Sequence, residues 1–284
     1  MESNEKILLS VQGLEKNYPG FSLKGISFGL REGMITGFIG RNGAGKTTTI
    51  NGILGFLRPD GGEVRYRGVP LTEDEQGIRA KIGFVSAGMT YYTRKTLKTI
   101  TDVTKEFYPD WDEGAYRKYM QAFGLTEEKT PAELSNGMKI KYALALALSH
   151  GAELFILDEP TSGLDPISRE ELVEVFLRLK DEGKTILFST HITSDLEKCA
   201  DRILFIQRGT LMADEGLDEF REKYRIAEIS GKPGEELQAA AKGLCRTREG
   251  ATVLISREDA AKFEGREATL EEIMVHLEKE AEEA

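Results

Sequence analysis

The stretch that decides the fold of this chain is Gly40-Arg41-Asn42-Gly43-Ala44-Gly45-Lys46-Thr47. Its spacing, Gly, four residues, then Gly-Lys-Thr, is the pattern of a phosphate-binding loop. Residues 34–39 before it form an apolar run that predicts a buried strand, and residues 48–54 after it predict the first turns of a helix. Loop N–H groups and the positive end of a helix dipole both attract phosphate. A glycine-rich turn can carry this pattern by chance, so the rest of the chain must decide.

Within the loop, two side chains have expected roles. Lys46 is expected to reach the β- and γ-phosphates of ATP, and the Thr47 hydroxyl is expected to hold Mg²⁺. The residues expected to contact ATP in this region are Gly40, Asn42, Gly43, Ala44, Gly45, Lys46, Thr47 and Thr48.

Composition is that of an ordinary globular protein with one or two domains: 284 residues, 40% hydrophobic and 30% charged. The net charge of −10 argues against nucleic-acid partners, which need clustered Lys and Arg. Cys199 and Cys245 are too few for a disulfide framework and suit packed positions in a reducing cytosol. The polar N-terminus does not resemble a signal peptide, and no apolar run is long enough to span a bilayer. Work at a membrane would require a second, spanning chain.

The first half of the chain predicts a β region and then a helical one. Short apolar runs between residues 7 and 39, and a glycine-bounded run at 61–68, predict an antiparallel β subdomain. Residues 82–85 predict a further strand, and a helical subdomain is expected at about 88–150. Its core is expected to contain Phe107, Tyr108, Trp111, Tyr116, Tyr119 and Phe123, some of which are available to the edge of a partner groove.

Strands and helices then alternate. Residues 154–157, 185–189 and 203–207 predict strands, while 168–182 and 192–199 predict helices. This alternation favours a parallel sheet covered on both faces, with ligands at the carboxyl ends of the strands. Gly40, Asp158 and His191 each lie just past a strand end, so we expect them to converge.

The last part of the chain, from about residue 213, is more charged. It offers two weak strand candidates, at 226–229 and 252–255, and an acidic amphipathic helix at 270–282. We therefore expect one domain over residues 1–215 and a small α+β extension over 216–284. The extension is expected to support a dimer or to regulate it, and an inert cap is the alternative.

Asp158-Glu159 follows an apolar strand and forms a Walker B pattern. Asp158 is expected to hold Mg²⁺, and Glu159 to act as general base towards the attacking water. A solvated strand end is the simpler interpretation of such a pair. The phosphate-binding loop upstream argues against it.

At this point the chain resembles the nucleotide-binding domain of ATP-binding cassette (ABC) transporters over roughly residues 6–215. Residues 134–138, Leu-Ser-Asn-Gly-Met, are similar to the family's signature sequence, Leu-Ser-Gly-Gly-Gln. They keep Ser135 and Gly137, the γ-phosphate contacts. The resemblance implies an α/β P-loop NTPase fold, with a mixed sheet, an antiparallel β subdomain and a helical signature subdomain.

Three more positions carry the resemblance. Asp165 ends Ser-Gly-Leu-Asp, which is similar to the D-loop, and His191 matches the switch histidine. Tyr18 stands 28 residues before Lys46, where the family has an aromatic that stacks on adenine. Each has a structural alternative: Ser135 is expected to cap a helix in any case, Tyr18 suits an ordinary turn, and a single His after a strand suits a structural role.

One position departs from the family. After the strand at 82–85 the family has Gln or an acid that binds Mg²⁺ and links the site to the membrane partner, and this chain has Ala87. Ser86 is a weak substitute. Water in the metal shell, altered coupling and slow turnover all stay open.

The resemblance implies an ATPase that closes head to tail with a second copy, or with a homologous cassette, around two ATP and Mg²⁺. It also implies an integral-membrane ABC-2 type permease as partner and a cytoplasmic location, peripheral on the inner face of the membrane. Residues 157–166 and 189–191 are most similar to the ABC-2 exporter branch. Residues 139–141 and 189–198 resemble ATPases of peptide, bacitracin or lantibiotic exporters, and within that branch the chain resembles exporters of phenol-soluble modulins.

Two other classes compete with a transporter. A soluble ABC ATPase acting on ribosomes would carry two cassettes, and one acting on DNA would carry long coiled-coil insertions. Neither pattern occurs in this sequence. A nucleotide-dependent regulator without hydrolysis is favoured by Ala87 but opposed by Glu159 and His191.

Overall fold

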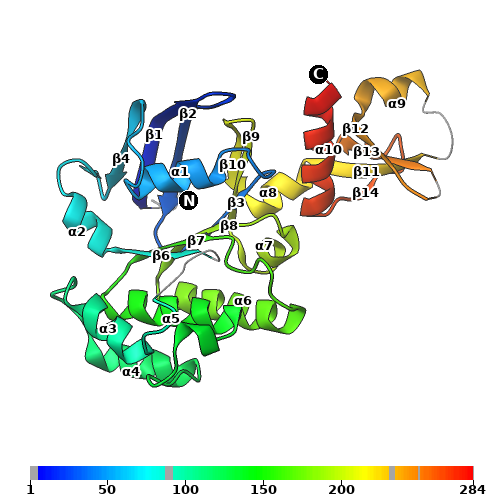
Figure 1. Ribbon diagram of the computed structural model, residues 1–284. Helices are drawn as coiled ribbons and strands as arrows, with labels where there is room; N and C mark the ends of the chain where they lie inside the picture. Colours follow the sequence, from blue (N-terminus) through cyan, green and yellow to red (C-terminus); the bar gives the residue numbers. More distant parts are fainter. Residues whose placement is uncertain (1–5, 87–91, 230–233, 249, 284) are drawn as a thin grey trace.

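The computed structural model of the chain describes residues 6–86, 92–229, 234–248 and 250–283. Within these residues three sheets carry the fold, and helices cover them or extend from them (Figure 1). Ala87, which the sequence singles out, lies outside the described residues.

The first sheet is antiparallel, in the order β2-β1-β4-β5. Its strands are β1 (Ile7–Tyr18), β2 (Phe21–Arg31), β4 (Gly61–Tyr66) and β5 (Val69–Pro70). The short apolar runs expected before the loop belong to two long strands, β1 and β2, which pair from Tyr18 with Phe21 at the turn to Ile7 with Arg31. The predicted antiparallel subdomain is confirmed.

The central sheet has the order β10-β9-β3-β8-β7-β6. Its strands are β3 (Ile35–Ile39), β6 (Ile82–Ser86), β7 (Leu154–Asp158), β8 (Thr185–Ser189), β9 (Arg202–Gln207) and β10 (Thr210–Gly216). All neighbours pair in parallel except β9 and β10. The prediction of a parallel sheet is therefore wrong at the β10 edge, because residues 208–209 turn the chain straight back from β9 into β10. The mixed sheet expected from the family resemblance is confirmed.

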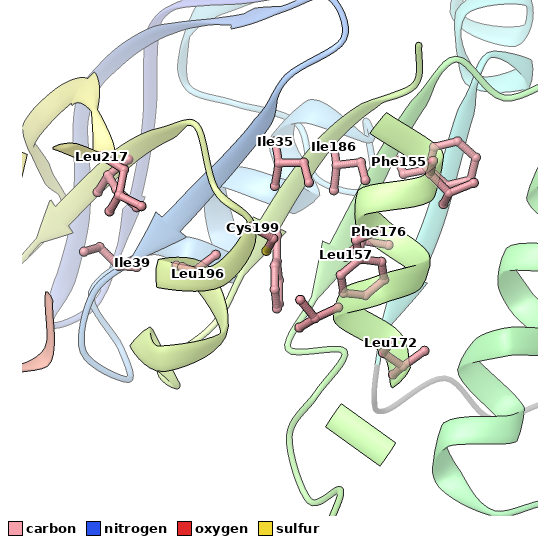
Figure 2. Close-up of a cluster of buried hydrophobic side chains, with 14 of the residues drawn as sticks. Ile35, Ile39, Phe155, Leu157, Leu172, Phe176, Ile186, Leu196, Cys199 and Leu217 are labelled. Atoms are coloured by element: carbon pink, nitrogen blue, oxygen red, sulfur yellow. The ribbon is translucent and has the colours of Figure 1, made fainter. Parts of the chain in front are cut away.

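Helices and buried side chains complete this layer. The helices are α1 (Lys46–Ile53), α2 (Glu75–Ala80), α6 (Pro166–Asp181), α7 (Thr193–Cys199) and α8 (Leu217–Glu222). Figure 2 shows part of the core, in which Ile186 and Phe155 from neighbouring strands lie with Leu172 and Phe176 of α6. β3, β7 and β8 are buried along their whole length, as continuous apolar runs predict for strands covered on both faces.

A helical arm projects from the sheet, with α3 (Leu97–Lys105), α4 (Glu113–Ala122), a 3₁₀ turn (Pro131–Glu133) and α5 (Asn136–Ser149) (Figure 1). Its core holds Tyr116, whose hydroxyl accepts a hydrogen bond from Thr101. The expected aromatic core is wrong for Phe107, which is 73% exposed because it follows the end of α3.

The C-terminal unit has a small sheet in the order β12-β13-β11-β14. Its elements are β11 (Tyr224–Ile229), α9 (Glu235–Ala240), β12 (Lys242–Arg246), β13 (Ala251–Ser256), β14 (Arg266–Glu267) and α10 (Leu270–Glu283). The two predicted strands and the predicted helix are present, and β12 and β14 are additional. In Figure 1, α10 stands between this sheet and the rest of the chain. Its Leu270 and Ile273 share the core that also contains Leu196 of α7.

Candidate active site

The loop at residues 40–45 joins β3 to α1 and is shaped by its glycines. Gly40 has φ of 155°, and a Cβ there would lie 2.3 Å from the carbonyl oxygen of Ile206. Gly43 and Gly45 have φ of 81° and 118°, conformations that other residues rarely adopt. No side chain caps the N-terminus of α1 within the described residues, so its first N–H groups are available to an anion.

Lys46, the first residue of α1, is buried inside this loop with 6% of its surface exposed. Its Nζ donates a hydrogen bond to the Gly40 carbonyl at 2.6 Å and lies 3.8 Å from Oε1 of Glu159. Burial lowers the pKa of Lys46, while the carboxylates of Glu159 and Asp158 act in the opposite direction. The ammonium is thus held by the loop in a site where it has little water.

Asp158, the last residue of β7, is held from two sides. Ser189 at the end of β8 donates a hydrogen bond to its Oδ1 at 2.5 Å, and the Thr47 hydroxyl is 3.4 Å from its Oδ2. The parallel register pairs Asp158 with Ser189 directly, which explains this contact. A hydroxyl and a carboxylate side by side are the hard oxygen ligands that Mg²⁺ prefers.

This pair of oxygens suits a metal that shares its ligands with a substrate. Within the described residues, no three His, Cys, Asp or Glu side chains are grouped to hold a metal by themselves. Mg²⁺ usually takes one or two protein oxygens and completes its shell with water and phosphate oxygens. The residues present therefore fit Mg²⁺ bound together with ATP.

Glu159 and His191 are in direct contact. The carboxylate Oε2 of Glu159 is 2.6 Å from Nδ1 of His191 and also accepts a hydrogen bond from the His191 backbone N–H at 3.4 Å. Glu159 has a φ of 53°, which is unusual for a residue with a side chain. Residues in such strained conformations cluster at functional sites. Its N–H donates to the Ser189 carbonyl at 3.0 Å, which fixes this turn against β8. The expected convergence of Gly40, Asp158 and His191 is present.

The remaining predicted residues of the loop and its surroundings lie at the rim. Asn42, Gly43 and Thr47 are exposed, Thr48 is half-buried, and Ala44 is buried. Tyr18 lies at the end of β1 and is 44% exposed, with Nζ of Lys16 5.9 Å from its ring centroid. The Tyr18 side chain is therefore accessible to solvent, with a cation beside its ring.

Ser135, Gly137 and Asp165 form a second group, away from the loop. Ser135 caps α5 by accepting a hydrogen bond from the N–H of Met138 at 3.2 Å, which confirms the expected cap. Gly137 faces Ser168, which donates a hydrogen bond to Asp165 at 2.6 Å. Within the described part of the chain, none of the three has a hydrogen bond or ion pair to residues 40–47.

Sequence reasoning missed Ser189. It stands two residues before His191 at the end of an apolar strand, so its place opposite Asp158 follows only once the strand order is known. Its hydroxyl is fully buried and orients the carboxylate expected to hold the metal.

Comparison with known proteins identifies the family. A family model described as ABC transporter matches residues 23–162. The chain is 33% identical over 207 residues to the bacitracin transport ATP-binding protein BcrA of Bacillus licheniformis, covering 72% of this chain and 68% of BcrA. It is 33% identical over 229 residues to the ABC-type transporter ATP-binding protein EcsA of Bacillus subtilis, covering 78% of this chain and 93% of EcsA.

A solved structure of an ATP-binding subunit of an ABC transporter shares the fold, with a TM-score of 0.68 and 30% identity over 75% of this chain and 92% of that one. Within the described residues, no helix has the length and apolarity needed to cross a membrane. With its phosphate loop, its Walker B pair and these relatives, the chain belongs to the ATP-binding subunits of ABC transporters, the ATP-hydrolysing components of that family.

Proposed function

We propose that this chain powers a separate membrane permease by closing as a dimer around two ATP and opening after hydrolysis, and that the cargo is an exported peptide or antimicrobial. One observation carries the dimer: Lys46, Asp158, Glu159 and His191 converge, while Ser135 and Gly137 lie apart on the helical arm. Residues 1–215 form the motor in this proposal, and 216–284 an accessory unit.

The roles of the residues follow from their contacts. Lys46 leaves the Gly40 carbonyl to bind the β- and γ-phosphates, which replaces one hydrogen bond by charge-assisted ones. Thr47 and Asp158 hold Mg²⁺, with Ser189 fixing the carboxylate. Bound Mg²⁺ would neutralise part of the charge that develops on the phosphates. Tyr18 stacks on adenine, a contact that the exposure of its side chain allows.

Glu159 acts as the general base, and His191 holds the γ-phosphate and the attacking water in place. In the free chain Oε2 of Glu159 is bound to His191 and Oε1 lies 3.8 Å from Nζ of Lys46, so a nucleotide that engages Lys46 and His191 leaves the carboxylate to accept the proton of the attacking water. The Nδ1–H of His191 then becomes available to the γ-phosphate. This exchange links proton transfer to the arrival of the nucleotide.

The second copy supplies what one copy lacks. Ser135 caps α5 through the N–H of Met138, and the other first-turn N–H groups of that helix, together with its dipole, offer an anion site. We infer that Ser135 and Gly137 of one copy meet the γ-phosphate held by the loop of the other, with Asp165 at the contact. ATP shared between two copies holds them together, and loss of the γ-phosphate releases them.

The permease is proposed to dock in a groove of about 320 Å³ between the sheet and the helical arm. Phe56, 62% exposed, packs edge-on against Phe84 at one side, and Tyr108 stacks on His150 at the other. An apolar groove of this kind suits a short amphipathic helix. Docking there makes the chain peripheral at the cytoplasmic face of a membrane that it does not cross itself. The name of BcrA supports antimicrobial cargo.

Glu159→Gln tests the motor. It should bind ATP, form a stable dimer by light scattering, and hydrolyse ATP at least about 100-fold more slowly, the usual range for loss of a general base. The matched control is Glu170→Gln on α6, whose glutamate pairs with Lys198 at 2.6 Å outside the site. Hydrolysis by Glu159→Gln at the wild-type rate would contradict the role of Glu159.

Phe56→Glu tests the proposed docking of a permease in this groove. With the permease encoded in a neighbouring reading frame co-expressed, this variant should lose co-purification and transport-dependent stimulation of hydrolysis while keeping basal ATPase activity. Met212→Glu, at another exposed apolar residue, is the control. Equal co-purification of both variants with the permease would mean that the permease does not bind in this groove.

A further inference from the structure

The C-terminal helix α10 reaches back to the phosphate-binding loop. Glu282 in its last turn forms an ion pair with Arg41 of the loop. One turn earlier, the Leu277 carbonyl accepts a hydrogen bond from Nε2 of Gln207, at the end of β9, at 3.1 Å. Its first turn is fixed as well, because the N–H of Leu270 donates to Glu197 of α7 at 2.8 Å. The helix is thus docked on the cassette at both ends.

The docked end of α10 is strongly negative. Its last turn contains no basic residue, and the negative end of the helix dipole lies there too. Two neighbouring residues of this turn are paired: Lys279 donates to the Leu244 carbonyl, and Glu280 pairs with Lys242. Glu278, on the other side of Lys279 in sequence, has an oxygen that accepts no hydrogen bond from the described residues.

Glu278 is the unusual residue of this turn. Its Oε1 is buried and, among the residues that the structure describes, has no hydrogen-bond partner. Burial lowers the pKa of Lys46, and the Glu278 carboxylate is among the charges that act against this effect, so it contributes to the field inside the loop. A phosphate placed near this carboxylate meets a like charge, which opposes its binding.

We propose that α10 is a built-in brake on nucleotide binding: Glu282 holds Arg41 of the loop in the free chain, and the carboxylates of Glu278 and Glu282 repel the phosphates of ATP. ATP binding and docking of the last turns of α10 therefore oppose each other. Glu278 contributes the larger share, because the Arg41–Glu282 pair is exposed and exposed pairs contribute little.

The first test is the affinity for a fluorescent ATP analogue with Mg²⁺, measured on the full chain. Glu278→Gln keeps the shape of the side chain and should tighten binding about three- to tenfold, the effect of removing one nearby unit charge partly screened by solvent. Glu282→Gln should tighten it less. Glu271→Gln removes the same charge from an exposed site two turns away on α10 and should leave the affinity unchanged.

The second test uses reciprocity, because two events that oppose each other must do so in both directions. ATP with Mg²⁺ should speed hydrogen exchange of the backbone amides in the last turns of α10, in a Glu159→Gln background that prevents turnover. An intact melting temperature for each variant shows that it is folded. Unchanged or weaker nucleotide binding by folded Glu278→Gln, or slower exchange in α10 with ATP, would overturn the proposal.

Discussion

Replacing Ser189 by alanine should destabilise the chain more than the loss of one small hydroxyl suggests. The Ser189 hydroxyl is fully buried and donates to Oδ1 of Asp158, which is itself 8% exposed. Its removal leaves a buried carboxylate oxygen without that donor, which costs about 1.5–3 kcal/mol for a charged acceptor. A loss of about 2 kcal/mol corresponds to a melting temperature about 4–8 °C lower in a chain of this size class.

The neighbouring strand provides a matched control. Thr36 on β3 is 1% exposed, and its Oγ1 has no hydrogen-bond partner within the described residues. Thr36→Val also removes a buried hydroxyl but leaves no other group without a hydrogen-bond partner, so the substitution should be neutral or slightly stabilising. Thermal melting of both variants by circular dichroism checks the difference. Equal shifts would refute the reasoning, since they would mean that the Asp158 contact contributes nothing beyond packing.

Three further outcomes are expected. Tyr18→Ala should weaken ATP binding about tenfold while Tyr18→Trp preserves it, because stacking of a base on an aromatic ring contributes about 1–3 kcal/mol; a fluorescent-nucleotide titration measures both. Burial raises the pKa of the Cys199 thiol to about 12, with Asp195 adding to the effect, so alkylation of the native chain followed by mass spectrometry should modify half-buried Cys245 before Cys199. Hydrogen bonds from Arg266 hold the pKa of Glu272 in the folded chain below its usual 4.5. The ionised Glu272 side chain therefore stabilises the fold above pH 4.5, and this stabilisation is lost as the pH falls through the lowered pKa. The melting temperature of Glu272→Gln should therefore lie below that of the wild type at neutral pH and approach it as the pH falls below 4.5, and a constant gap would contradict this.

The elements predicted well from the sequence are those whose local pattern matches their final environment. β7 and β8 are short continuous apolar runs, and both are buried along their length. The phosphate-binding loop was equally predictable from the sequence, because its glycines meet local requirements of the backbone. Gly40, for example, has no room for a Cβ.

The features missed from the sequence depend on contacts between distant segments. β12 and β14 are short strands with polar or charged residues, and they form because β13 and β11 offer edges to pair with. The role of Ser189 depends on the register of two parallel strands. The contact of Glu282 with Arg41 joins residues 241 positions apart, and no sequence pattern announces it.

These contacts also explain why one copy of the chain should hydrolyse ATP poorly. In the free chain Lys46 is satisfied by the Gly40 carbonyl and Glu159, and Glu159 is satisfied by His191. Each of the groups needed for catalysis is therefore already bound to another one, and binding energy from phosphate must replace these contacts before the base is free. In the proposed dimer a second copy would add that energy through Ser135 and Gly137, whereas the proposed brake, α10, would subtract from it. The rate of hydrolysis then depends on two opposing effects, dimer formation with a second copy and docking of α10 in the same chain. The nucleotide affinity of Glu278→Gln and the dimer formation of Glu159→Gln must therefore be measured separately.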